Sequence, residues 1–159
     1  MNVRCGLGYD LHRLEPGRKL IVGGVELKFD KGPAGHSDGD VLAHAICDAL
    51  LGAAGLGDIG THFPDNDPKW KGADSLVFLK HAAKLLADKN FSIEYIDAVV
   101  ILERPKLGPH FPQMREAVAN ALSMAAERIH FKAKTNEGVD SIGRGEAIAA
   151  HVVATVEKR

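Results

Sequence analysis

The alternation of helical and strand-like segments is the feature that most constrains this fold. Apolar residues recur at helical spacing in three segments, and short runs rich in β-branched residues lie between them. The expected helices span residues 40–54, 74–88 and 109–125. The expected strands span residues 3–11, 93–103, 128–135 and 146–157, with a hairpin at 19–22 and 25–29. These elements predict an α+β fold: a mainly antiparallel or mixed four-stranded sheet with two or three helices on one face, plus a small hairpin.

The chain is expected to be one domain that oligomerises. Its 159 residues contain no internal repeat, low-complexity tract or linker, so the single domain is assigned to residues 1–159. Helices on one face leave the other face of the sheet uncovered. Few aromatic residues (6%) and many alanines and valines favour close packing of that face against other subunits.

Charge and hydropathy exclude several function classes. The formal net charge of -1 argues against a nucleic-acid partner, because proteins that bind the phosphate backbone usually carry a basic excess. No membrane association is expected, since the longest apolar stretch, residues 41–57, is interrupted by His44 and Asp48. Cys5 and Cys47 make neither a disulfide framework nor a cysteine zinc site, which favours a reducing compartment.

Asp10, His12 and His44 form the most informative set of polar residues. Asp10 and His12 share one face of the first strand, where both can reach one metal ion, although a capped strand end would also explain the pair. His44 lies in the first helix, and Asp48, one turn later, could orient its ring; a core histidine is the alternative. Two histidines and one carboxylate leave a coordination position open, as catalytic zinc sites do.

Two further polar clusters could bind charged groups. Asp58, Asp65 and Asp67 could hold hydroxyls or a second cation, but Asp also favours ordinary turns. Lys134 and Glu137 lie at a strand end, where Glu favours a hard cation such as Mg²⁺; a solvated strand end is the alternative. Arg144, in a Gly-Arg-Gly turn, is a candidate anion-binding residue.

The order and spacing of these segments resemble a known enzyme family. The resemblance rests on the runs GYDLHRL, GHSDGDVLAHAICDALLGAAGLGDIG, FPDNDPKWKGADS, RPKLGPH, KAKTNE and IGRGEAIA, and it covers nearly the whole chain. The family is 2-C-methyl-D-erythritol 2,4-cyclodiphosphate synthase. It implies a ferredoxin-like βαβ fold, a homotrimer with active sites between subunits, and a CDP-linked methylerythritol phosphate substrate. The 2-phosphate of that substrate attacks the β-phosphate, and CMP leaves.

The resemblance also implies residue roles. Asp10, His12 and His44 match the ligands of zinc or another divalent metal, and Glu137 matches the residue holding Mg²⁺ or Mn²⁺. His36 and Thr135 match the positions that stabilise the transition state. The positions matching the substrate pocket near the zinc are Ser37, Asp58, Gly60, Phe63, Pro64, Asp65, Asn66 and Asp67. The positions matching the nucleotide side are Leu102, Pro105, Lys106, Leu107, Gly108, Lys134 and Asn136.

Two departures from the family pattern stand near Glu137. Ser141 occupies a position that is aromatic in many bacterial members, and Lys134 replaces a threonine. In the family, the aromatic position and the one matching Arg144 line a cavity on the trimer axis that can hold an isoprenoid diphosphate. Arg144 is kept here, so an anion could still bind.

Two other functions share parts of this pattern. A metal-dependent phosphohydrolase of another nucleotide-linked compound would use the same metal site with water as nucleophile. A non-catalytic ligand-binding trimer is the third hypothesis, which retention of the four metal-ligand positions disfavours. The expected location is a bacterial cytoplasm, or a plastid-type organelle if a targeting peptide has been removed.

Overall fold

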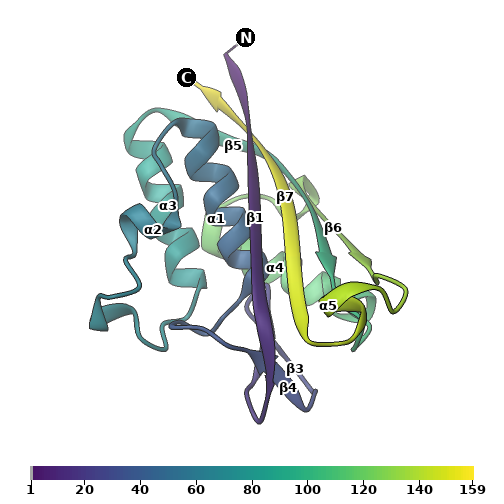
Figure 1. The fold of residues 1–159 in the computed structure, drawn as a ribbon. Helices are drawn as coiled ribbons and strands as arrows, with labels where there is room; N and C mark the ends of the chain where they lie inside the picture. Colours follow the sequence, from purple (N-terminus) through teal and green to yellow (C-terminus); the bar gives the residue numbers. More distant parts are fainter. Residues whose placement is uncertain (1) are drawn as a thin grey trace.

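The computed structural model describes residues 2–159 as a mixed β-sheet with helices packed on one face (Figure 1). The sheet has the strand order β4-β1-β7-β5-β6. Its strands are β1 (Val3–Pro16), β4 (Lys31–Pro33), β5 (Phe91–Ile101), β6 (Ile129–Lys134) and β7 (Ala147–Lys158). Strand β7 is antiparallel to both neighbours, β1 and β5, whereas β5 and β6 are parallel. The expected α+β class is confirmed.

Three long helices cover the sheet, and short elements connect them. The long helices are α1 (Val41–Ala54), α3 (Leu76–Asp88) and α4 (Phe111–Leu122). The short elements are the hairpin strands β2 (Leu20–Val22) and β3 (Val25–Leu27), helices α2 (Ile59–His62) and α5 (Asp140–Gly143), and 3-10 turns at Pro68–Trp70, Gly108–His110 and Ala126–Arg128. Helix α4 links the parallel strands β5 and β6, which makes the expected βαβ unit.

The sheet has five strands, where the sequence predicted four. The additional strand, β4, lies in the segment 30–37, where no strand was expected and where the glycines and proline favour a loop. Three residues of β4 pair with the end of β1, which extends five residues beyond its expected end at residue 11. Pro33 is tolerated there because β4 is an edge strand.

Helix α1 is the centre of the core. It is buried almost all round because β1 and β7 lie on one side and α3 on another. Asp40 caps its first turn by accepting a hydrogen bond from Ala43 N at 3.0 Å. The same carboxylate accepts from the backbone N–H groups of Gly23 (2.9 Å) and Gly24 (2.7 Å), which ties the β2–β3 hairpin to the helix start.

Helix α1 and strand β1 lie in direct backbone contact. A Cβ atom at Gly8 would lie 1.8 Å from the carbonyl oxygen of Ala45, and one at Gly6 would lie 1.9 Å from that of Ala49. Only glycine permits this approach. Because β1 side chains alternate, the face that carries Gly6 and Gly8 also carries Asp10 and His12. The close approach therefore brings these two side chains to the helix that carries His44.

On the opposite face of the sheet, exposed apolar side chains lie on β1 and β7, beside the Asp97–Lys132 ion pair on β5 and β6. Leu7 and Tyr9 on β1 are 71% and 51% exposed, and Val153 on β7 is 47% exposed. Leu7 is paired with Val153, and the Tyr9 ring lies 4.8 Å from that of its partner His151. We call this surface the open sheet face. A contiguous apolar surface of this kind indicates an interaction site.

Candidate metal centre

Asp10, His12 and His44 converge on one point. His12 Nε2 lies 2.8 Å from Asp10 Oδ2, His44 Nδ1 lies 2.9 Å from the same oxygen, and the two nitrogens are 3.2 Å apart. The three side chains are 12–25% exposed, so they stand at the floor of a cleft and not on open surface. The sequence-predicted ligands are therefore brought together by β1 and α1 as expected.

The spacing of these atoms fits a small divalent cation. Ligand atoms about 2.0–2.1 Å from a tetrahedral Zn²⁺ are about 3.3 Å from one another. The observed separations of 2.8–3.2 Å are close to that value, so a cation above the triangle would contact all three with a small outward adjustment. Two imidazoles and one carboxylate suit a divalent metal ion, of which zinc is one, and leave one tetrahedral position open.

Asp10 and His44 shift each other's pKa values. Burial raises the pKa of Asp10, but hydrogen bonds and charge interactions with His12 and His44 outweigh burial, and the net shift is well below the usual range. Burial lowers the pKa of His44, but Asp10 outweighs it, and the net shift is upward. The ionised oxygen of Asp10 thus faces two imidazole nitrogens, and a cation that displaces a proton from this site would be held by the same negative charge.

The second nitrogen of His44 faces two hydroxyl groups. His44 Nε2 lies 2.8 Å from Ser75 Oγ and 3.1 Å from Ser37 Oγ. Asp48 was expected to orient this ring, but its carboxylate accepts a hydrogen bond from Ile59 N at 2.7 Å instead. The expectation for Asp48 is wrong because its carboxylate turns toward the start of α2, where a backbone N–H lacks an intrahelical acceptor.

A cavity of about 250 Å³ opens above the three ligands. Predicted pocket residues line it together with an aromatic wall of Phe63, Trp70 and Phe78. The predicted residues that line it are His36, Ser37, Gly60, Phe63 and Asp65. Pro64, Asn66, Asp58 and Asp67 belong to the same segment but are not among its lining residues. The cavity has a polar floor and an apolar side, which fits a small phosphorylated polyol.

Two of the predicted pocket residues hold local structure. Asp58 Oδ1 accepts hydrogen bonds from Thr61 N (2.8 Å) and Thr61 Oγ1 (2.7 Å), which caps α2 and lowers the pKa of Asp58. Asp67 Oδ1 accepts from Lys69 N at 3.0 Å. The Asp67 carbonyl lies 3.3 Å from His36 Nε2, so this segment also positions His36. The alternative interpretation, that these aspartates stabilise ordinary turns, therefore applies to Asp58 and Asp67.

The predicted nucleotide-side residues gather at the ends of β5 and β6. Leu102 N donates to Lys134 O at 2.9 Å, and Asn136 N donates to Glu103 Oε2 at 3.3 Å, so residues 102–108 start beside residues 134–137. Thr135 Oγ1 lies 3.3 Å from Glu137 Oε1. None of these residues lines the cavity over His44. One chain therefore presents two separate half-sites: the metal half-site around Asp10, His12 and His44, and the strand-end half-site of residues 102–108 and 134–137.

Arg144 belongs to neither half-site as the chain stands. Its guanidinium forms a two-point ion pair with Glu146 at 3.0 and 3.2 Å, and it is exposed. The interaction with Glu146 raises the pKa of Arg144. To bind an anion, the Arg144 guanidinium would have to leave Glu146 or contact both Glu146 and the anion.

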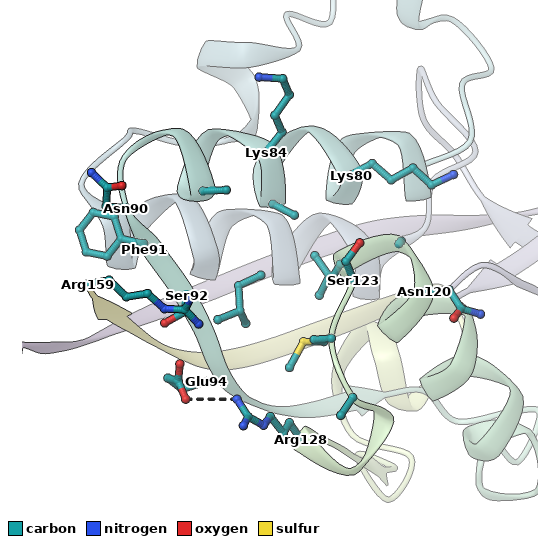
Figure 2. A pocket seen from close by; sticks show the side chains of 17 residues that line it. Lys80, Lys84, Asn90, Phe91, Ser92, Glu94, Asn120, Ser123, Arg128 and Arg159 are labelled. Atoms are coloured by element: carbon teal, nitrogen blue, oxygen red, sulfur yellow. Dashed lines mark hydrogen bonds and ion pairs between the residues drawn. The ribbon is translucent and has the colours of Figure 1, made fainter.

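A larger cavity lies away from the metal half-site (Figure 2). It has a volume of about 870 Å³ and lies among α3, the end of α4 and the start of β5. It contains no histidine, and its one carboxylate, Glu94, is already paired with Arg128 at 3.2 Å. No metal-ligand set is present there, so the metal chemistry belongs to the smaller cavity.

Comparisons with known proteins identify the family of this chain. A family model described as the YgbB family matches residues 3–157. The 2-C-methyl-D-erythritol 2,4-cyclodiphosphate synthase of Geotalea uraniireducens (strain Rf4) is 53% identical over 157 residues, covering 99% of this chain and 100% of that protein. The solved IspF–CDP complex of Plasmodium falciparum has a TM-score of 0.88 and 32% identity, covering 99% of this chain and 97% of that one.

A longer protein also contains this fold. The structure of bifunctional IspDF from Campylobacter jejuni has a TM-score of 0.95 and 39% identity, and the match covers 99% of this chain. This chain spans only 42% of that protein's length. The match therefore concerns one part of that protein.

Proposed function

This chain belongs to the YgbB family, and from that premise we propose how its two half-sites carry out the family's reaction. It is a lyase of non-mevalonate isoprenoid biosynthesis that cyclises 4-diphosphocytidyl-2-C-methyl-D-erythritol 2-phosphate and releases CMP. The phosphohydrolase alternative is not favoured, because the curated relatives that match over the full chain carry the synthase name. The observation that carries the residue assignments is the triangle of Asp10, His12 and His44.

The reaction needs positioning and charge neutralisation more than a base. An oxygen of the 2-phosphate forms a bond to the β-phosphorus, the bond from that phosphorus to the bridging oxygen breaks, and CMP carries that oxygen away. The nucleophile is already anionic and tethered, so folding the substrate into a ring supplies most of the rate gain, about 7–11 kcal/mol in well-oriented cases. The remaining task is to hold several phosphate oxygens close together.

Each half-site would supply part of this task. Asp10, His12 and His44 hold zinc, and Glu137 holds Mg²⁺ or Mn²⁺. These cations, when bound, neutralise phosphate charge as Lewis acids. His36 and Thr135 donate hydrogen bonds to the phosphates as charge moves in the transition state. Ser37, Gly60, Phe63 and Asp65, which line the cavity above the metal ligands, bind the methylerythritol phosphate, and the strand-end half-site binds the cytidine.

We further propose that the complete site forms between subunits of a homotrimer. Two observations support this arrangement. None of the strand-end residues lines the cavity over the metal ligands, so the half-sites stand apart in one chain, and a second subunit can bring its strand-end half-site to this metal half-site. The open sheet face provides an apolar surface through which subunits can associate. Arg144 and Ser141 would then lie near that interface, with Arg144 available to an anion.

The location of the enzyme is part of the same proposal. None of the helices within residues 2–159 is long and apolar enough to cross a membrane. The curated relatives come from bacteria such as Geobacter sulfurreducens and Clostridium perfringens. We propose that the chain works in a bacterial cytoplasm.

The direct test is turnover of the CDP-linked substrate with Zn²⁺ and Mg²⁺. We expect equimolar CMP and cyclic diphosphate, resolved by phosphorus-31 NMR. A linear product that contains an oxygen from labelled water would instead support the phosphohydrolase. Binding of CDP without turnover would support the non-catalytic trimer.

The shared site has its own test. Glu137→Gln and His44→Ala each inactivate a different half-site, so neither variant should turn over alone. When the two are unfolded and refolded together, each site takes one half-site from each of two neighbours, and about a quarter of sites are intact in random trimers. No recovered activity in verified mixed trimers would mean that both half-sites act within one chain.

A further inference from the structure

We propose that Ser75 and Asp38 are positioning residues that fix the His44 ring so that its Nδ1 lone pair faces the metal. The inference rests on the proposed metal site and adds two residues to it. Neither was predicted from the sequence as part of the site. Both act through His44 and do not contact the cation themselves.

The geometry forms a chain of three polar groups. His44 Nε2 lies 2.8 Å from Ser75 Oγ, and Ser75 Oγ in turn donates to Asp38 Oδ1. The other carboxylate oxygen, Oδ2, accepts a hydrogen bond from Ser75 N at 2.9 Å. Ser75 is fully buried, so no water competes for its hydroxyl.

The direction of each hydrogen bond follows from Asp38. Its two oxygens accept from Ser75 N, from Ser75 Oγ and from Asp40 N at 3.0 Å, so this carboxylate acts only as an acceptor. A serine hydroxyl has one proton, and here the proton points to Asp38. The oxygen of Ser75 must then accept from His44, which requires a proton on Nε2.

A proton on Nε2 determines which nitrogen can bind a cation. In a neutral imidazole one nitrogen is a donor and the other is an acceptor. With Nε2 protonated, Nδ1 carries the lone pair, and Nδ1 is the atom that lies 2.9 Å from Asp10 and 3.2 Å from His12. Metal-bound histidines generally use such a partner on the other nitrogen, where it sets ring orientation and basicity.

Ser37 is the competing partner for the same nitrogen. Its Oγ lies 3.1 Å from His44 Nε2 and also accepts a hydrogen bond from Gly39 N at 3.3 Å. Ser37 has no carboxylate partner comparable to Asp38, and it lies on the cavity wall where substrate is expected. Ser75 is closer and buried, so it should control the ring in the resting enzyme.

The test measures zinc affinity in metal-free protein by competition with a chromophoric chelator. Ser75→Ala should bind zinc about 10–100-fold more weakly than wild type, and Asp38→Asn should change affinity in the same direction. Ser75→Thr keeps the hydroxyl and should recover most of the affinity. Asp74→Ala is the matched control, because Asp74 accepts a hydrogen bond from Leu76 N at the same end of α3 without touching His44.

A second measurement needs no variant. Nitrogen-15 NMR of the zinc-loaded wild type should show a protonated Nε2 and a metal-shifted Nδ1 on His44. A metal-shifted Nε2 would overturn the proposal, and so would full zinc affinity in folded Ser75→Ala. A zinc loss equal to that of Asp74→Ala would assign Ser75 a purely structural role and also overturn it. Absence of zinc binding in the wild type would instead refute the metal site itself.

Discussion

Replacing Gly8 with alanine should push α1 away from β1 and weaken the metal site. The new Cβ would lie 1.8 Å from the Ala45 carbonyl oxygen, 2.8 Å from its carbonyl carbon and 2.9 Å from Ala49 N. All three are backbone atoms, so no side chain can rotate away. Contact distances for such atoms are above about 3 Å, which requires the strand and helix to separate by about 1 Å or more.

The magnitude of the effect follows from that separation. Forcing extra volume into a close-packed contact usually costs about 1–3 kcal/mol of unfolding free energy. His44 precedes Ala45, so the shift moves its Nδ1 away from Asp10 and His12, whose atoms now lie within 3.2 Å. Metal ligands tolerate errors of about 0.2 Å, so we expect zinc affinity to fall by at least about tenfold.

Two measurements and one control decide the outcome. Urea unfolding of the metal-free protein gives the change in stability, and chelator competition gives the zinc affinity. Gly52→Ala is the matched control, because its Cβ would meet nothing within 4 Å and alanine is favoured over glycine in a helix by about 1 kcal/mol. If Gly8→Ala matched wild type in both stability and zinc affinity, the backbone contact would not set the ligand geometry.

Four further predictions follow from the same structure. His44→Ala should lose zinc, measured by metal analysis, while gel filtration shows an unchanged assembly; retained zinc would contradict the ligand assignment. Asp40→Ala leaves three backbone N–H groups without their acceptor and should cost about 2 kcal/mol or more in urea unfolding. Leu7→Glu places a charge on the open sheet face and should give folded monomers by analytical ultracentrifugation and normal circular dichroism; an intact trimer would place the interface elsewhere. The metal-free protein should lose stability below pH 3.8, because the pKa of Asp10 is lowered on folding. It should also lose stability above pH 6.5, because the pKa of His44 is raised on folding. A melting temperature that stays constant from pH 5 to 9 would contradict the prediction for His44.

The sequence predicts the long elements well because their periodicity is strong. All three long helices and the four main strands were expected, and every bound except one lies within three residues of its expected position; β1 runs five residues past its expected end. Strand β4 was missed because three residues are too short to show a period, and its glycine and proline are typical of loops. Its pairing is imposed by the end of β1, which is a tertiary effect.

Site residues could be predicted only where their neighbours lie near in sequence or match a family pattern. Asp10 and His12 share a strand face by the simplest rule of strand geometry. Asp48 lies one helical turn from His44, but sequence spacing does not reveal that Ile59 N competes for its carboxylate. Ser75 lies 31 residues from His44 with no pattern that connects them, so only packing reveals the contact.

The division of the site into two half-sites also could not be predicted from the spacing of residues in the sequence. Glu137 and Thr135 carry plausible chemistry, but their distance from His44 depends on the sheet order, which places β6 at the edge far from β1. The family resemblance implied a site between subunits, and the separation of the half-sites within one chain supports that proposal. The confirmed prediction is the gathering of Asp10, His12 and His44.

The carboxylate of Asp40 has a consequence for how substrate can enter. Its bonds to Gly23 and Gly24 close the chain between residues 24 and 40 into a loop that is fastened at its base. His36 and Ser37 lie inside that loop, whereas His44 lies beyond the fastening. Within that loop β4 is paired with β1, and Asp38 accepts a hydrogen bond from Ser75 N, so the span that carries His36 and Ser37 is held at both ends. The pocket side chains and the ligand helix therefore keep their places together while substrate exchanges.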